Sequence, residues 1–167
     1  MFSREAFGQP CAIRLQLKAT FISGLRRLRP RHPNDTLVSK MILGTGIDIV
    51  EIPRIQQSVE RFGQRFLDRV YTAAEQAYCL RKRRSAESLA ARFAAKEAGA
   101  KALGTGISRG VNWLEIEVSR EPGGRPTLHF HGRAAEIANR MGVAHTALSL
   151  THTAELSFAS VLLEDSR

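Results

Sequence analysis

Residues 87–107 constrain the fold of this chain more than any other stretch. They read ESLAARFAAKEAGAKALGTGI, and the alanine-rich run followed by glycines predicts one long helix that ends at Gly104. Residues one turn apart share a helix face, so Phe93, Glu97 and Ala100 lie together on the stripe expected to face the core. Glu97 therefore needs a partner, because an unpaired buried charge is strongly unfavourable.

A second acid also lies where its surroundings disfavour it. Residues 41–50, MILGTGIDIV, predict a strand that contains Asp48, although aspartate is poor in strands. An ordinary intrahelical pair of Glu97 with Lys101 would explain one acid but not both. Sequences break local rules mainly where function requires it. The simplest joint explanation is a hard cation such as Mg²⁺, which binds one or two carboxylates together with water and phosphate.

Three separated segments agree with one family. GTGIDIVEIPRI from Gly44, LAARFAAKEAGAKALGTGI from Leu89 and LSLTHT from Leu148 resemble, in order and spacing, the holo-acyl-carrier-protein synthase family of phosphopantetheinyl transferases. The resemblance covers residues 41–164. It implies transfer of 4′-phosphopantetheine from coenzyme A to a serine of apo acyl carrier protein, with release of 3′,5′-ADP, as in fatty acid biosynthesis. It also implies a homotrimer that holds coenzyme A between neighbouring subunits.

The same resemblance implies roles for individual residues. Asp48 and Glu97 would hold Mg²⁺ on the diphosphate, and Lys101 would contact the reacting phosphate or assist the leaving oxygen. His152 belongs to the third segment and is expected in the active site as a catalytic residue. The general base stays open between a metal-bound water, a carboxylate and His152. The residues expected to bind coenzyme A are Arg92, Gly104, Thr105, Gly106, Gly124, Arg125 and Pro126.

Three arginines accompany the helix predicted after the first strand. This helix begins at Pro53, and its buried stripe is expected to be Ile55, Val59, Phe62 and Phe66. Arg54, Arg61 and Arg65 repeat the same spacing one residue earlier and would line a second face. A solvated basic face is the ordinary explanation. The resemblance supplies an acidic carrier protein as partner and favours a docking face with Arg54 as its best match.

The remaining pattern predicts an α+β fold, with a mainly antiparallel sheet packed against the long central helix. Thr72 and Glu75 form a capping box that opens a helix through Leu80. A half-buried strand is expected from Val111, with Leu114 among its core-facing residues. The other predicted elements are a hairpin partner over residues 127–131, a helix over 133–141, and strands over 146–151 and 156–163.

Charge separates the first forty residues from the rest. The chain has 167 residues and a formal net charge of +9, and residues 1–40 carry eight Lys or Arg against two acids, so +6 lies there. We expect this extension to be a disordered basic tail, or upstream sequence included by a wrong start, because the family pattern begins at Met41. Its arginines would also suit an organelle transit peptide or a nucleic-acid-binding arm. Residues 41–167 are predicted to form one phosphopantetheinyl transferase domain.

Composition excludes several classes of protein. The apolar residues 19–28 are too short and too interrupted to span a membrane, and they lack the features of a signal peptide. Cys11 and Cys79 provide neither a disulfide framework nor metal-ligand spacing, so we expect a reducing cytoplasmic location without membrane or nucleic-acid partners.

Two alternative functions remain. A non-enzymatic basic module that binds an acidic protein or nucleic acid would leave the two misplaced acids unexplained, and a Mg²⁺-dependent hydrolase would cleave diphosphates with water.

Overall fold

The computed structural model describes residues 41–107 and 110–166. The basic tail expected over residues 1–40 lies outside the described residues. Within the part of the chain that is described, no helix is long and apolar enough to cross a membrane.

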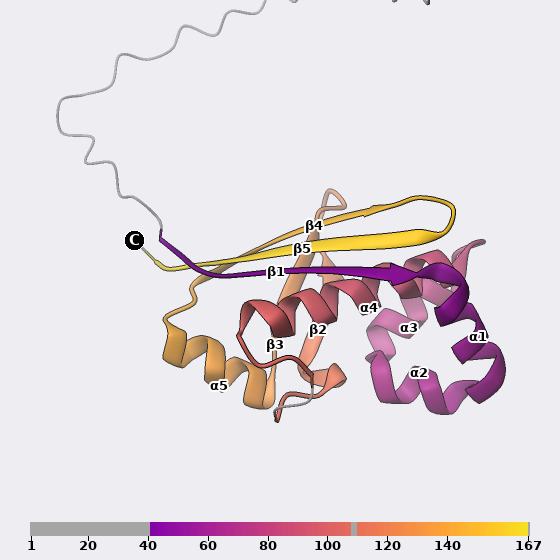
Figure 1. The fold of residues 1–167 in the computed structure, drawn as a ribbon, viewed down its shortest axis with the longest axis horizontal. Coiled ribbons are helices and arrows are strands. Elements are labelled where there is room, and N and C mark those ends of the chain that lie inside the picture. Colours follow the sequence, from indigo (N-terminus) through magenta and orange to yellow (C-terminus); the bar gives the residue numbers. More distant parts are fainter. Residues whose placement is uncertain (1–40, 108–109, 167) are drawn as a thin grey trace, which may run out of the picture. The chain divides into compact units, whose positions relative to one another are not determined.

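Helices and strands follow one another without strict alternation (Figure 1). In chain order they are β1 (Ile42–Glu51), α1 (Ile52–Phe62), α2 (Gln64–Val70), α3 (Ala73–Leu80), α4 (Ser85–Ala102), the 3₁₀ helix η1 (Trp113–Glu115), β2 (Ile116–Arg120), β3 (Pro126–Phe130), α5 (Gly132–Met141), β4 (His145–His152) and β5 (Leu156–Glu164). The three longest strands lie over α4, with α1, α2 and α3 gathered at one end of that helix. The α+β class expected from the sequence is confirmed.

Both sheets are antiparallel. The larger one has the strand order β1-β5-β4, and β2 pairs with β3 in a separate hairpin. Asp48 of β1 lies opposite Ala159 of β5, which in turn lies opposite Leu150 of β4. One face of β5 is buried through Ser157, Ala159, Val161 and Leu163. This face packs against α4, so the core lies between the sheet and the long helix.

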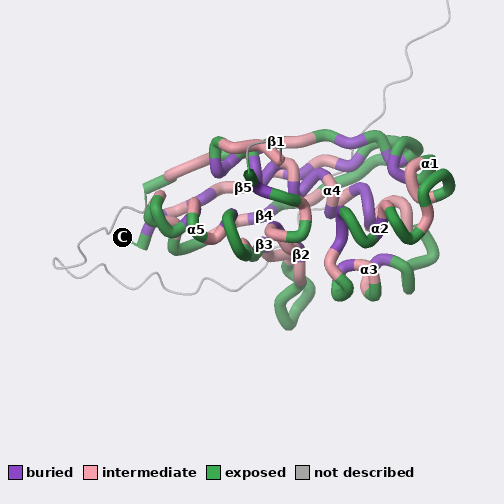
Figure 2. The backbone as a smooth tube through the Cα atoms, turned by 90° about the horizontal axis from the view of Figure 1, so that it is seen from below, coloured by how far each residue is buried: buried purple, intermediate pink, exposed green. Residues whose placement is uncertain are grey.

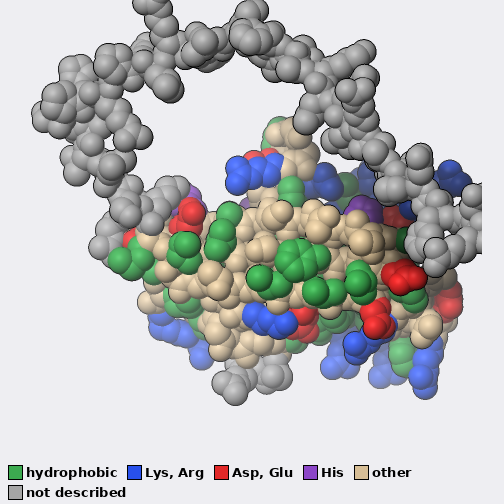
Figure 3. Space-filling view, turned by 45° about the horizontal axis from the view of Figure 1, so that its top comes forward, with side chains coloured by type: hydrophobic (Ala, Val, Ile, Leu, Met, Phe, Trp, Pro, Cys, Tyr) green, Lys and Arg blue, Asp and Glu red, His purple; other side chains and the backbone are tan. Residues whose placement is uncertain are grey.

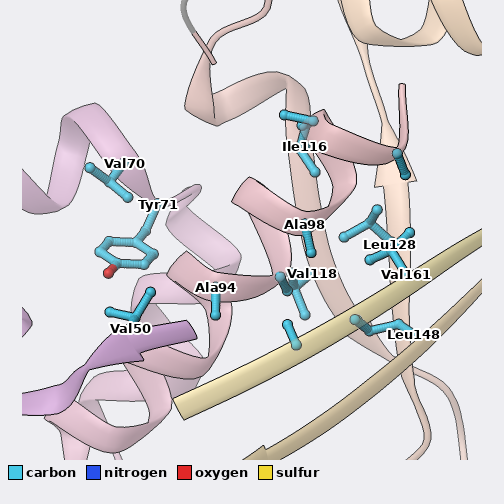
Figure 4. Packing of buried hydrophobic residues seen from close by; sticks show 14 of the residues in the cluster. Val50, Val70, Tyr71, Ala94, Ala98, Ile116, Val118, Leu128, Leu148 and Val161 are labelled. Carbon is cyan, nitrogen blue, oxygen red and sulfur yellow. The ribbon is translucent and has the colours of Figure 1, made fainter. Parts of the chain in front are cut away.

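Small residues let α4 approach the sheet closely. A Cβ atom on Gly46 would lie 1.9 Å from the carbonyl oxygen of Ala98, and one on Gly44 would lie 2.2 Å from that of Ala102. Only glycine fits at such distances. Figure 4 shows Ala94 and Ala98 of α4 facing the core, and Figure 2 shows buried positions concentrated along this helix and the strands beside it.

The helix predicted from Pro53 through Phe66 is two helices. The chain breaks at Gly63, whose φ of 53° is a left-handed conformation that favours glycine, so α1 ends and α2 starts there. Phe62 is 51% exposed, so its place in the predicted buried stripe was wrong. Arg65 lies on α2, and the three arginines therefore do not share one helix.

The strand predicted from Val111 starts later than expected. The side chain of Asn112 accepts a hydrogen bond from the amide of Leu114, and Glu115 accepts one from the amide of Asn112, which closes η1 instead. Leu114 is 42% exposed, and the strand begins at Ile116. Local capping therefore overrode the two-residue alternation. The capping box of α3, by contrast, is confirmed.

Candidate functional site

Asp48 and Glu97 line the same cavity although 48 intervening residues separate them in the chain. This cavity of about 390 Å³, here called the acidic pocket, lies between β1, α1, α2 and α4. Its walls include Asp48, Glu51, Arg54, Phe66, Phe93 and Glu97. The two acids that violated their local patterns are therefore neighbours in the fold.

The strand alternation and the glycine contact explain why they meet. Asp48 shares a face of β1 with Gly46 and Val50, and this face is turned toward α4. Glu97 precedes Ala98, the residue whose carbonyl oxygen touches Gly46. The same contact that brings helix and strand together thus brings Glu97 beside Asp48.

Lys101 joins the pair from the next turn of α4. Its Nζ atom donates a hydrogen bond to Oδ1 of Asp48 at 2.8 Å and another to the carbonyl oxygen of Ile47 at 3.1 Å. The lysine side chain is 49% exposed, whereas that of Asp48 is 14% exposed. Lys101 of α4 therefore binds Asp48 of β1, and the lysine side chain stays accessible from solution.

Burial and charge both act on Glu97. Burial raises the pKa of its carboxyl, the negative charge of Asp48 raises it further, and Lys101 opposes these effects. A divalent cation between the two carboxylates would relieve this repulsion. Mg²⁺ suits the donor set, because it is commonly held by one or two carboxylates and keeps its other positions for water and phosphate. Among the described residues there is no cluster of three or more His, Cys, Asp or Glu side chains that could hold a metal ion.

Two residues expected at the active site, His152 and Arg92, lie outside the acidic pocket of this chain. His152 is the last residue of β4, and its Nε2 atom is 3.8 Å from Oε2 of Glu87 at the start of α4. Arg92 is only 4% exposed and its guanidinium stacks 4.2 Å from the ring centre of Tyr78. Neither of them lines the acidic pocket.

The two glycine loops also lie away from this pocket. The amides of Thr105 and Gly106 donate to the carbonyl oxygen of Ala100, which makes the loop after α4 a C-terminal cap. The carbonyl oxygen of Gly124 accepts a hydrogen bond from Arg120 at 2.6 Å in the turn before β3. Gly104 lies in the loop after α4 and Arg125 in the turn before β3, and Pro126 is the first residue of β3.

The arginines form a surface next to the acidic pocket. Arg54 lines the pocket, whereas Arg61 stacks over the ring of Phe62 at 5.0 Å. Arg65 flanks a hollow of about 310 Å³ together with Phe62 and Phe66. The sequence did not predict that Phe62 is exposed, because the helical spacing assigned it to the core.

Phe93 also lines the acidic pocket, and its helical spacing from Glu97 could have predicted this. It lies one turn before Glu97, on the same face of α4, and its ring packs 4.4 Å from that of Trp113. Spacing alone indicated a core residue, and no signal in the sequence indicates that Phe66 of α2 completes the wall.

Comparison with known proteins identifies the family. The sequence profile of the 4′-phosphopantetheinyl transferase superfamily matches residues 44–158. A holo-[acyl-carrier-protein] synthase of Koribacter versatilis (strain Ellin345) is 60% identical over 125 residues, which are 75% of this chain and 100% of that protein. The chain belongs to the holo-[acyl-carrier-protein] synthase family.

Solved structures of this synthase family share the fold. The synthase of Neisseria meningitidis superposes with a TM-score of 0.68 at 36% identity and covers 75% of this chain and 100% of its own. The Helicobacter pylori synthase, crystallised in complex with coenzyme A, gives a TM-score of 0.64 at 34% identity, with coverage of 71% and 98%. The resemblance inferred from the three sequence segments is thereby confirmed.

Proposed function

We propose that this synthase transfers 4′-phosphopantetheine from coenzyme A to a serine hydroxyl of apo acyl carrier protein and releases 3′,5′-ADP. Family membership supports the reaction. The observation that carries the site assignment is that Asp48 and Glu97 line one pocket and that Lys101 donates a hydrogen bond to Asp48. A cytoplasmic location, expected from the cysteine content, stays a prediction.

The reaction determines what the pocket must do. The serine hydroxyl gives its proton to a general base and its oxygen forms a bond to a phosphorus of the coenzyme A diphosphate, while the bond from that phosphorus to the oxygen of 3′,5′-ADP breaks. Negative charge grows on the departing oxygen, so the protein must mainly hold the reactants in line and offset that charge. Mg²⁺ held by Asp48 and Glu97 would neutralise the diphosphate and orient the leaving group.

The chain's own cation completes the charge balance. The Nζ atom of Lys101 lies 2.8 Å from Oδ1 of Asp48 and the lysine side chain is half exposed, so it can contact phosphate oxygens that lie against the carboxylates. The ammonium would stabilise the charge that develops on the leaving oxygen. Substitution of Lys101 by Met should therefore lower kcat more than it changes the KM for coenzyme A.

A homotrimer would explain the outer face of the larger sheet. Ile47, Ile49 and Leu156 are 55%, 60% and 41% exposed, and Figure 3 shows hydrophobic side chains gathered over this face. An exposed apolar surface of this kind is usually covered by a protein partner. In a trimer His152, which lies outside the acidic pocket of its own subunit, would be available to coenzyme A held by a neighbour. Light scattering of the purified protein tests the assembly, and a monomer would contradict it.

Carrier protein would dock on the arginine surface. Arg54, Arg61 and Arg65 are exposed beside the acidic pocket, and Phe62 adds an apolar contact between them. Charge complementarity with an acidic helix would orient the carrier so that its serine reaches the pocket.

Mass spectrometry of the carrier tests the function. Apo carrier incubated with coenzyme A, Mg²⁺ and this protein should gain the mass of phosphopantetheine, and a chelator should abolish the gain. Tight binding of the carrier without the mass gain would favour the non-enzymatic binding module. Release of 3′,5′-ADP in the absence of carrier would favour the diphosphate hydrolase.

A further inference from the structure

A second pair of opposite charges lies inside the protein, away from the acidic pocket. The Nζ atom of Lys96 is 2.8 Å from Oε2 of Glu75, and both side chains are completely buried. Neither residue lines the acidic pocket, although Lys96 directly precedes Glu97 in the sequence. A buried ion pair is not in itself evidence of stability, because desolvation offsets much of its attraction. Its geometry therefore has to show what the pair does.

The ammonium of Lys96 has no donor left for a substrate. Besides Glu75, it donates to the carbonyl oxygen of Trp113 at 2.8 Å and to that of Ile116 at 2.6 Å. These three acceptors use all three N–H groups of the ammonium. Burial lowers the pKa of Lys96, while the carboxylate of Glu75 opposes that effect. Lys96 is thus joined to η1 and to the first residue of β2, and it faces the protein interior.

The carboxylate of Glu75 is equally occupied. Its Oε1 atom accepts a hydrogen bond from the amide of Val118 at 2.9 Å, and its Oε2 atom accepts one from the amide of Thr72 at 2.8 Å. The pair therefore connects the start of α3, the middle of α4, η1 and β2. We call Glu75, Lys96 and their four backbone partners the buried anchor.

The buried anchor is connected to the acidic pocket through one aromatic contact. Trp113 gives its carbonyl oxygen to Lys96, and its ring packs 4.4 Å from Phe93, which lines the pocket. On the other side of α4, the close contact of Gly46 with Ala98 holds the helix against β1. The helix is thus fixed at two places on its circumference, and between them lies the face that carries Glu97.

We propose that Lys96 is a positioning residue of the transfer reaction, which together with Glu75 fixes η1 and the rotation of α4 and so places Phe93 and Glu97 in the acidic pocket. This inference rests on the proposed function. The two lysines of the helix would divide the work, because Lys101 meets the substrate phosphates whereas Lys96 never touches them.

A neutral replacement of the pair separates positioning from folding. Lys96→Met alone leaves Glu75 buried without its cation, so we expect a strongly destabilised protein. Glu75→Gln combined with Lys96→Met removes both charges, and we expect it to regain most of the lost melting temperature. Because Met cannot donate to the carbonyls of Trp113 and Ile116, the double variant should still lose about 10- to 100-fold in kcat. Its KM for coenzyme A should change less than about threefold. Arg140→Met, at an exposed cation of α5, is the matched control.

Two kinetic results would overturn the proposal. A folded double variant with wild-type kcat would mean that the pair only stabilises the fold. A raised KM for coenzyme A at unchanged kcat would mean that Lys96 contacts the substrate. Should the double variant not fold, Trp113→Leu keeps the hydrogen bonds to Lys96 and removes only the ring that supports Phe93. It should show the same selective loss of kcat, and an unchanged kcat would reject the proposed connection.

Tryptophan fluorescence, which does not depend on activity, separates the proposed transfer function from the proposed positioning role of Lys96. Trp113 is the single tryptophan of the chain, so its fluorescence reports on η1 directly. We expect its emission to shift to the red and to become easier to quench in the double variant than in Arg140→Met. Identical emission in both would contradict the anchoring role. If the wild type and Arg140→Met both failed to modify carrier protein, the proposed function would be wrong, and the fluorescence comparison would still judge the buried anchor.

Discussion

Gly46→Ala is the substitution that most sharply tests how the acidic pocket is built. The new Cβ atom would lie 1.9 Å from the carbonyl oxygen of Ala98, 2.8 Å from the amide nitrogen of Ala102 and 2.9 Å from the carbonyl carbon of Ala98. All three are backbone atoms of α4, so no side-chain rotation relieves the clash. Ordinary contact begins at 3.4 Å, and α4 must therefore retreat from β1 by about 1.5 Å, the difference between 3.4 and 1.9 Å.

Both stability and catalysis should respond. Overpacking of this kind costs about 1–3 kcal/mol, and a clash with backbone belongs at the upper end. A loss of about 3 kcal/mol lowers the melting temperature of a domain of this size by about 10 °C. Because the retreat also separates Glu97 from Asp48, the rate of transfer should fall by about 100-fold, the effect expected of a misplacement of about 1 Å. Thermal unfolding and the rate of carrier modification measure the two effects.

Gly99→Ala is the matched control, since it adds the same methyl group on the face of α4 that packs against β2 and β3. There the nearest atoms are Cδ2 of Leu128 at 2.8 Å and Cγ2 of Ile116 at 3.3 Å, both on side chains that can shift. The gain in helix propensity, about 1 kcal/mol, offsets the crowding. We expect near-wild-type stability and rate for this variant. Wild-type behaviour of Gly46→Ala as well would refute the close contact between α4 and β1 as the origin of the pocket.

Three further predictions concern charge and the basic tail. Because the folded protein raises the pKa of Glu97 above its ordinary 4.5, wild-type stability should fall relative to Glu97→Gln as the pH rises above that value. The variant should therefore melt higher at neutral pH while transferring nothing, and a melting difference that does not vary with pH would contradict the shift. Arg54→Glu should raise the KM for carrier protein about tenfold without lowering kcat, and less so in high salt; an equal effect of Arg140→Glu on α5 would argue against a specific docking surface. Deletion of residues 1–40 should leave transfer intact, and a large loss of activity would show that the tail takes part.

Pattern violations in the sequence predicted the site better than regular patterns predicted its surroundings. Asp48 in a strand and Glu97 on a core stripe were predicted to share one cation, and the structure brings both to the acidic pocket. Their role as Mg²⁺ ligands remains a prediction. The long helix was also predicted, and the structure ends it at Ala102, two residues before Gly104. Propensity and capping are local properties, so a single sequence can reveal them.

The errors arose where tertiary structure decides. The spacing from Ile55 to Phe66, at i, i+4, i+7 and i+11, continued across Gly63 and gave no sign that this residue would adopt a φ of 53° and break the helix. Ile47 and Ile49, the apolar neighbours of Asp48 in β1, are exposed, whereas Asp48 faces α4. Which face of a strand is covered depends on the elements that pack against it. The usual inference, that the apolar side chains of a strand face the core, therefore fails for β1. Lys96 offered no signal, because two of its acceptors are backbone carbonyls of η1 and β2 and the third is the side chain of Glu75 on α3.

Titration of Mg²⁺ into the protein bound to coenzyme A, followed by calorimetry, tests the central claim most directly. Asp48 and Glu97 are proposed to hold one cation against the diphosphate. The wild type should therefore bind one Mg²⁺ per subunit, and Asp48→Asn and Glu97→Gln should each weaken that binding by at least about tenfold, about 1.4 kcal/mol. Undiminished binding in both variants would show that the two carboxylates do not share the metal.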